Sequence, residues 1–317
     1  MRPGYTPTME KQEAGVPPHA SAQDRPATRA GLLDMVRTAP QQMVFVTGGP
    51  PVTPYAGPAS PTWTNPEYAL HHARSWESPF VLGAMLPLEA AARPFEGAGL
   101  RAVSRYQSLM AELADSSLPV VAQVWGPLTM AATIVGLEPF VESLAGSSEV
   151  YSHTSRGLDA TLAVTEAVLE TRPALLWIGE PLAALASPES LSAIWLPAMR
   201  QLLARSRAAG ADPVVHVSGA AVHVLDAVSR AAPAGMSITA DTPLAIARAK
   251  LPAHMVVFGN LDSMRLLDRD EEWLRSQGAR MAEEMRGHPF IATPGSAVPG
   301  RIPVSKLAAF VEGARRA

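Results

Sequence analysis

Short apolar runs alternate with longer stretches of helical periodicity along most of this chain, and no other pattern in it narrows the choice of fold as much. The runs are rich in β-branched and aromatic residues, and each ends in Gly, Pro or a small polar residue, as strands do before a turn into a helix. Eight runs occur, at residues 43–47, 80–84, 119–124, 174–178, 213–217, 236–239, 254–258 and 289–292. Eight strand–helix units predict an α/β fold, a single-domain (β/α)₈ TIM barrel. An open doubly wound sheet is the alternative, although no GxGxxG or P-loop pattern follows the first run.

Two stretches between the runs carry clear helix signals. Pro303 suits a first helical turn, and apolar residues follow it at helical spacing. Ser187, Pro188 and Glu189 read as an N-cap, a first-turn proline and a first-turn carboxylate. They predict a helix that runs on to about residue 202, with a kink at Pro197.

Composition limits the classes of function. Hydrophobic residues make up 47% of the 317 residues, which is enough to bury a large core. The formal net charge of -3 provides no field that would attract nucleic acid or an anionic membrane surface. The sequence contains no cysteine, which excludes disulfides, a thiol nucleophile and every thiolate metal site.

The chain is expected to divide into a tail and one domain. Prolines among polar residues predict a flexible tail over residues 1–29, with glutamates where a secretory signal would need an apolar run. Residues 30–317 then form the barrel. Because no eighteen-residue apolar run occurs without a charge or a break, no membrane-spanning helix is predicted, and a cytoplasmic location is expected.

Chemistry in such a barrel takes place at the carboxyl ends of the strands, so polar residues there are the candidates for the site. They are Gln123, Glu180, His216, Ser218, Asp241, Asn260, Asp262 and Ser296, with Trp125 beside Gln123. Some also have an ordinary structural explanation. Gln123 and Trp125 can simply cap a strand, and Asp241 can N-cap the short helix that follows it. Asn260 and Asp262 follow a Gly in a strand-to-helix turn, where Asx turns are common.

Glu180 and His216 are the sharpest candidates. Glu180 follows an apolar run and a glycine, and a carboxylate at that position has to be paired, hydrated or functional. His216 lies inside the apolar run Val-Val-His-Val. A core histidine with a backbone partner is the competing explanation for it.

Five motifs, taken in order, resemble the uroporphyrinogen decarboxylase superfamily. They are 126–131 (GPLTMA), 179–181 (GEP) continuing through 187–189 (SPE) to 195–197 (WLP), 216–219 (HVSG), 258–262 (FGNLD) and 294–299 (PGSAVP). The likeness covers roughly residues 30–316 and is strongest to the methylcobamide:coenzyme M methyltransferase branch. It implies a TIM barrel with its site at the strand carboxyl ends, a small-molecule substrate and a corrinoid protein as partner.

The resemblance breaks down at the chemistry. In the methyltransferase branch, a His-x-Cys-Gly motif and a late Pro-Gly-Cys motif bind zinc, and the zinc activates a thiol. Here His216 matches the histidine, whereas Ser218 and Ser296 occupy the two cysteine positions. An aliphatic hydroxyl does not ionise as a thiol does, so standard zinc ligation is not expected. The decarboxylase branch fits no better, because its arginine-rich clamp for substrate carboxylates has no counterpart near residues 47–50.

Three hypotheses for the function remain open. The favoured one is a divergent enzyme that acts on a small substrate by methyl transfer, decarboxylation or a related lyase step. In this hypothesis Glu180 and His216 form an acid/base pair, and Ser218 and Ser296 line the pocket as hydroxyl donors. The substrate-binding residues are then Gln123, Trp125, Asp241, Asn260 and Asp262.

The second hypothesis replaces zinc by another divalent metal, held by Glu180, His216 and Asp241. The third is a catalytically silent barrel that binds a corrinoid protein, a small ligand or a partner subunit. A hydrolase with Ser218 as nucleophile is the weakest alternative, because Ser218 and His216 share a strand face without having to meet.

An aromatic stretch after the first run allows two roles. It contains Trp63, Tyr68 and Trp76, and it is expected to form either a lid over the site or the contact of a homodimer.

Overall fold

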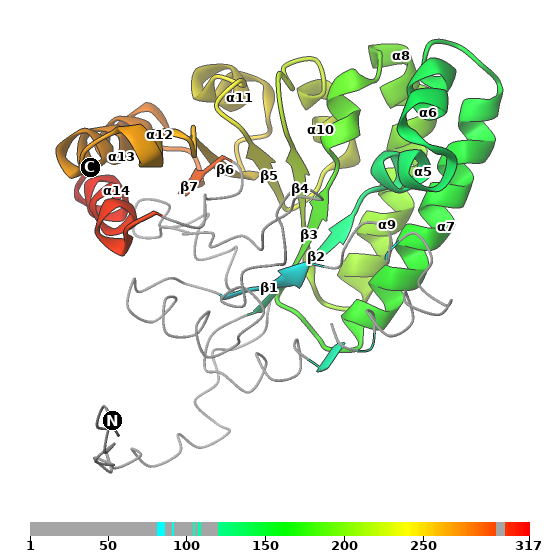
Figure 1. Ribbon diagram of the computed structural model, residues 1–317, viewed down its shortest axis with the longest axis horizontal. Helices are drawn as coiled ribbons and strands as arrows, with labels where there is room; N and C mark the ends of the chain where they lie inside the picture. The colour runs from blue at the N-terminus through cyan, green and yellow to red at the C-terminus, as the bar shows by residue number, and fades with distance from the viewer. Residues whose placement is uncertain (1–80, 86–90, 92–103, 105–106, 109–119, 296–301) are drawn as a thin grey trace, which may run out of the picture.

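The computed structural model describes residues 81–85, 91, 104, 107–108, 120–295 and 302–317. Within them, seven parallel strands form one sheet in sequence order (Figure 1). The strands are β1 Val81–Met85, β2 Val120–Trp125, β3 Leu175–Gly179, β4 Asp212–Val217, β5 Gly235–Ile238, β6 Val256–Leu261 and β7 Phe290–Pro294. This is the strand order of a (β/α)₈ barrel, and it confirms seven of the eight expected strands. The expected strand at 43–47, the tail at 1–29, and Trp63, Tyr68 and Trp76 lie outside the described residues.

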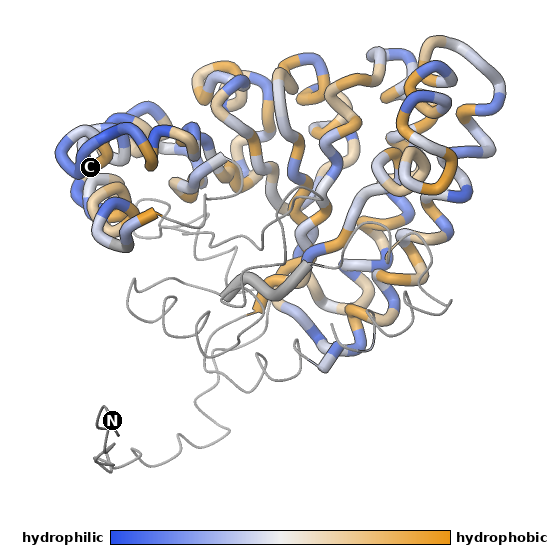
Figure 2. The backbone as a smooth tube through the Cα atoms, in the orientation of Figure 1, coloured by the Kyte–Doolittle hydropathy of each residue, from blue (hydrophilic) through white to orange (hydrophobic). Residues whose placement is uncertain are grey.

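Helices follow strands β2 to β7 and cover one side of the sheet (Figure 1). They are α5 Pro127–Val135, α6 Leu137–Leu144, α7 Glu149–Leu169, α8 Pro188–Ser190, α9 Leu196–Ala208, α10 Leu225–Ala231, α11 Leu244–Lys250, α12 Arg265–Asp268, α13 Glu271–Glu284 and α14 Val304–Arg316. Helix α7 contacts β2, α9 contacts β4, α11 contacts β6 and α13 contacts β7. The outer helices carry both hydrophilic and hydrophobic residues (Figure 2), as helices do when only one face meets the core.

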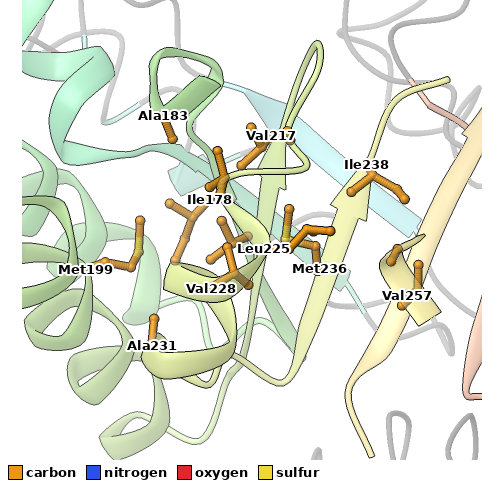
Figure 3. Packing of buried hydrophobic residues seen from close by; sticks show 14 of the residues in the cluster. Ile178, Ala183, Met199, Val217, Leu225, Val228, Ala231, Met236, Ile238 and Val257 are labelled. Carbon is orange, nitrogen blue, oxygen red and sulfur yellow. The ribbon is translucent and has the colours of Figure 1, made fainter. Parts of the chain in front are cut away.

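The two faces of the sheet bury different sets of side chains. Trp177, Val214 and Phe258 belong to a small apolar cluster on the face turned away from the helices, which is the inside of the barrel. The residues between them, such as Ile178 and Val217, pack against the helices in the larger core (Figure 3). Side chains of a strand alternate between its two faces. The same alternation determines whether the side chain of the residue directly after the strand points into the barrel or toward the helices.

The expected helix from Ser187 to residue 202 is present but interrupted. Ser187 caps its start by accepting a hydrogen bond from the N–H of Ser190. A π-helical turn, η5 Leu191–Trp195, then precedes α9, and the N–H of Leu196 bonds to the carbonyl of Leu191. Pro197 has no N–H to donate, and the shifted hydrogen-bond register lies directly before it.

Strand β6 ends at Leu261 rather than at residue 258. Asn260 therefore lies in the strand and not, as expected, in the turn after it. Among the described helices, none is long and apolar enough to cross a membrane.

Candidate functional site

His216 occupies the inner face of β4 near its carboxyl end. It is in register with Gly179 of β3 and Ser237 of β5. Its ring lies between two serines, with Nδ1 2.9 Å from Ser237 Oγ and Nε2 3.1 Å from Ser218 Oγ. The ring also stacks against Trp177, with 5.9 Å between the ring centroids. The contacts are therefore side-chain hydroxyls and an aromatic ring, not the backbone partner of an ordinary core histidine.

The environment of His216 keeps its ring neutral. Burial lowers the pKa of His216 from its ordinary value to about 4, because desolvation disfavours the charged imidazolium. At neutral pH the ring is therefore an uncharged group with one N–H and one lone pair. It can donate one hydrogen bond and accept one, but it does not attract an anion by charge.

Glu180 points to the other side of the sheet, into the helix layer. Its Oε2 accepts a hydrogen bond from the N–H of Leu128 at 3.1 Å. Its Oε1 accepts from the N–H of Thr129 at 2.9 Å and from the Thr129 hydroxyl at 2.6 Å. These N–H groups belong to the first turn of α5, whose own N-cap residue, Gly126, has no side chain to offer. Glu180 thus caps a helix of the preceding βα unit.

The Glu180 carboxylate is fully buried and closely packed. Glu180 is 0% exposed, and a Cβ on Gly126 would collide with its Oε2. Burial raises the pKa of Glu180 from its ordinary value to about 7, although hydrogen bonds from Thr129 and Leu128 and the nearby indole of Trp195 act to lower it. The indole N–H of Trp195 itself makes no hydrogen bond of standard geometry.

The expected Glu180–His216 acid/base pair is wrong as a direct contact. The carboxylate is bonded to α5, and the imidazole is bonded to two serines inside the barrel. The one link between the two residues runs through the backbone, where the N–H of Glu180 donates to the carbonyl of His216 at 2.8 Å. The physical reason is strand alternation, because Trp177 and Gly179 face inward and the next residue faces outward.

Three of the expected substrate-binding residues, at the carboxyl ends of β5 and β6, have hydrogen-bond partners within the chain. Asp241 is exposed and accepts a hydrogen bond from Thr239 Oγ1 at 3.2 Å; it does not cap α11, whose N-cap is Pro243. Asn260 Nδ2 donates to the carbonyl of Thr242 at 2.7 Å.

Asp262 has the same kind of local role. Its Oδ1 accepts from the N–H of Met264 at 3.0 Å, and its Oδ2 lies 3.4 Å from Arg265 Nε. This is the Asx turn that was weighed as the ordinary explanation.

Gln123 and Trp125 lie on the inner face of β2, where Gln123 is buried and Trp125 half-buried. The Trp125 ring covers Gly179, since a Cβ there would lie 3.1 Å from the indole. Ser296 lies outside the described residues. Its neighbour Gly295 closely approaches the end of β5, where a Cβ on Gly295 would lie 2.7 Å from the Cα of Thr239.

Sequence reasoning missed Ser237 as a partner of His216. The run Met-Ser-Ile-Thr at residues 236–239 alternates apolar and small polar residues, which is the signal that Ser237 and Thr239 face inward. Their distance from His216 depends on the strand register, which the sequence does not state.

The site does not fit a thiolate-bound zinc ion. The chain has no cysteine, and both ring nitrogens of His216 face serine hydroxyls, which are poor zinc ligands. In the part of the chain that the structure describes, no three His, Asp or Glu side chains gather as a metal site. The expected set of metal ligands, Glu180, His216 and Asp241, is therefore wrong. The three side chains face different surroundings and do not come together.

Comparisons with known proteins give a family and a fold. The family model described as uroporphyrinogen decarboxylase (URO-D) matches residues 88–317. A solved methyltransferase from Methanosarcina mazei shares 16% identity with a TM-score of 0.73, covering 91% of this chain and 98% of that one. A B12-independent methionine synthase from Shewanella sp. W3-18-1, solved in complex with selenomethionine, shares 9% identity with a TM-score of 0.57, covering 86% and 97% of the two chains. No curated protein is similar enough to count as a relative. The structural likeness shows that the fold is the expected barrel.

Proposed function

Because the chain belongs to the uroporphyrinogen decarboxylase family, we propose that it is an enzyme that transfers a methyl group to or from a small molecule at the carboxyl ends of its barrel strands. One observation carries the proposal: His216 faces the barrel interior with its ring nitrogens at 2.9 and 3.1 Å from two serine hydroxyls. The fold shared with a methyltransferase and a methionine synthase supports methyl transfer as the reaction class. Decarboxylation, the reaction in the name of the family, is the alternative at the same site.

His216 and Ser218 are the proposed catalytic residues. The neutral imidazole exchanges a hydrogen bond or a proton with the substrate through the Ser218 hydroxyl. Ser296 and the pair Gln123 and Trp125 are proposed to line the substrate pocket.

Glu180 is proposed as a positioning residue and no longer as a catalytic one. It holds the first turn of α5 through its carboxylate and the carbonyl of His216 through its N–H. A corrinoid protein is the proposed partner that supplies the methyl group.

A methyl-transfer assay tests the proposal. The full chain is incubated with methylcobalamin and a small thiol, with and without added zinc, and cleavage of the cobalt–methyl bond is followed by absorbance. We expect His216→Ala and Ser218→Ala each to lower the rate by about 100-fold, the usual scale for losing an acid/base group. His254→Gln, at the opposite end of the barrel before β6, is the control and should keep the wild-type rate. A wild-type rate in His216→Ala would sink the proposal.

A silent binding barrel is the second candidate. It is favoured by the engagement of Asp241, Asn260 and Asp262 in loop contacts, which leaves few polar groups for chemistry. Binding of methylcobalamin by the wild-type protein without any cleavage, across several thiols, would favour this candidate over the enzyme.

A further inference from the structure

The hydroxyl of Ser237 determines how the His216 ring can act. Ser237 lies within β5 and is 2% exposed. Among the described residues, the hydrogen-bond partner of its side chain is His216 Nδ1, at 2.9 Å. No other partner of the Ser237 hydroxyl is present in that part of the structure.

A buried hydroxyl with a single partner is satisfied only if it donates. If Ser237 accepted a bond from an Nδ1–H, its own hydrogen would be buried without an acceptor, which is the unfavourable case. If it donates to the Nδ1 lone pair, no donor is left unsatisfied. The neutral ring then carries its hydrogen on Nε2.

The consequence at the other side of the ring falls on Ser218. The Nε2–H donates to Ser218 Oγ across 3.1 Å, so the serine hydrogen is not used by the histidine. Ser218 is half-buried. The next residue, Gly219, has a φ of +80°, and no described atom lies within 4 Å of a Cβ built on it. Among the described residues, the space beside Gly219, the neighbour of Ser218, is therefore unfilled, and the Ser218 hydroxyl hydrogen has no partner within the relay.

We propose that Ser237, His216 and Ser218 form a hydrogen-bond relay of fixed direction, which presents the Ser218 hydroxyl hydrogen to an acceptor oxygen of the substrate. Each donor in the chain is polarised by the bond it accepts, so the last hydroxyl donates more strongly than an isolated serine. The group recognised is a carbonyl or carboxylate oxygen. The inference deepens the proposed function, on which it rests, by naming the part of the substrate that meets Ser218. Ser237 acts in it as a positioning residue.

The opposite direction would give a different chemistry from the same distances. With the ring hydrogen on Nδ1, Ser218 would donate its hydrogen to Nε2 and become a nucleophile. The tautomer of His216 therefore decides between an oxygen-binding hydroxyl and an activated serine.

Nitrogen-15 NMR of the full chain, labelled at histidine and free of substrate, tests the direction. The His216 signals are identified by their loss in His216→Gln. We expect the Nε2–H tautomer to exceed the other by about tenfold or more, since the alternative leaves a buried donor unsatisfied. Ser237→Ala should raise the Nδ1–H fraction several-fold, whereas Ser237→Thr, which keeps the hydroxyl, should not. Ser152→Ala, on the exposed side of α7, is the matched control.

A dominant Nδ1–H tautomer, or a ratio near one, in the wild-type protein would overturn the relay. A fluorophosphonate probe gives a second readout, and we expect no labelling of Ser218; labelling that is lost in His216→Gln would establish the nucleophile instead. Because the tautomer is measured without substrate, failure of the methyl-transfer assay leaves this result intact. A reversed tautomer in an active enzyme would likewise leave the proposed function standing.

Discussion

Glu180 holds the first turn of α5 from a different βα unit, and this single carboxylate satisfies three donors. Two are backbone N–H groups that have no partner within a helix, and the third is the Thr129 hydroxyl. All of them are buried with it. A residue in this position contributes to stability through groups that would otherwise be desolvated and unpaired.

Removing this side chain should destabilise the protein clearly. We expect Glu180→Ala to lower the free energy of unfolding by about 3 kcal/mol, because several buried donors lose their acceptor. Glu180→Gln should cost less, about 1 to 2 kcal/mol, because it keeps one acceptor oxygen. Urea unfolding measures both, with Glu189→Ala on the exposed start of α8 as control. If Glu180→Ala unfolds at the wild-type urea concentration, the capping role is refuted.

The difference between His216 and Glu180 could have been derived from the sequence in part. Counting alternate residues back from Glu180 places it on the same face as Ile178, toward the helices, and not on the face of Trp177. His216 shares the inner face with Trp177, so this alternation already separates the two candidates. What alternation does not give is the partner. The contact of Glu180 with Leu128 and Thr129 joins residues 51 and 52 positions apart, and only the packing of α5 on the end of β3 brings them together.

At the scale of elements, the start of α5 depends on the close packing of Gly126 against Glu180. Gly126 lacks the side chain that would collide with the Glu180 carboxylate, and its N–H donates to the carbonyl of Gly179 at 2.8 Å. The end of β2, the end of β3 and the beginning of α5 are thereby fixed against one another.

A double-mutant cycle tests this coupling. We expect Gly126→Ala to destabilise the wild-type protein by about 2 kcal/mol or more through overpacking. The same change should cost much less in a Glu180→Ala background, where the space is free. Thermal or urea unfolding of the four proteins gives the interaction energy, and additive costs would show that the two positions are independent.

The elements that the sequence predicted best are those whose signals are local. The described strands lie within a few residues of the apolar runs, and Ser187 caps the helix that it was expected to cap. The π-helical turn at Leu191–Trp195, directly before Pro197, was not predicted. The local signal of the proline predicted only a kink there.

For the whole molecule, two titratable groups, the buried Glu180 and the half-buried His216, act on stability with opposite signs. The folded-state pKa of Glu180 is raised to about 7, so its contribution is fully present below its unfolded pKa and is lost as the pH rises toward 7. The folded-state pKa of His216 is lowered to about 4. Its neutral form is favoured by folding, so its contribution is lost as the pH falls from about 6.5 toward 4. Between about pH 4.5 and 6.5 the two effects cancel in part.

Single variants should separate the two opposing pH dependences of the unfolding free energy. We expect the unfolding free energy of Glu180→Gln to rise with pH across this window relative to the wild-type protein, by roughly 1 kcal/mol per pH unit. His216→Gln should show the reverse, a fall of similar size. Urea unfolding at pH 4.5, 5.5 and 6.5 measures both. Parallel curves for the two variants would contradict the assignment of either group.

The close packing of Gly126 against Glu180 also has an evolutionary consequence. A side chain at position 126 and a full-length carboxylate at position 180 exclude each other, so neither site can drift alone without a loss of stability. In distant relatives with the same barrel, the two positions are expected to change together: a residue larger than glycine at the first should be accompanied by a shorter one at the second.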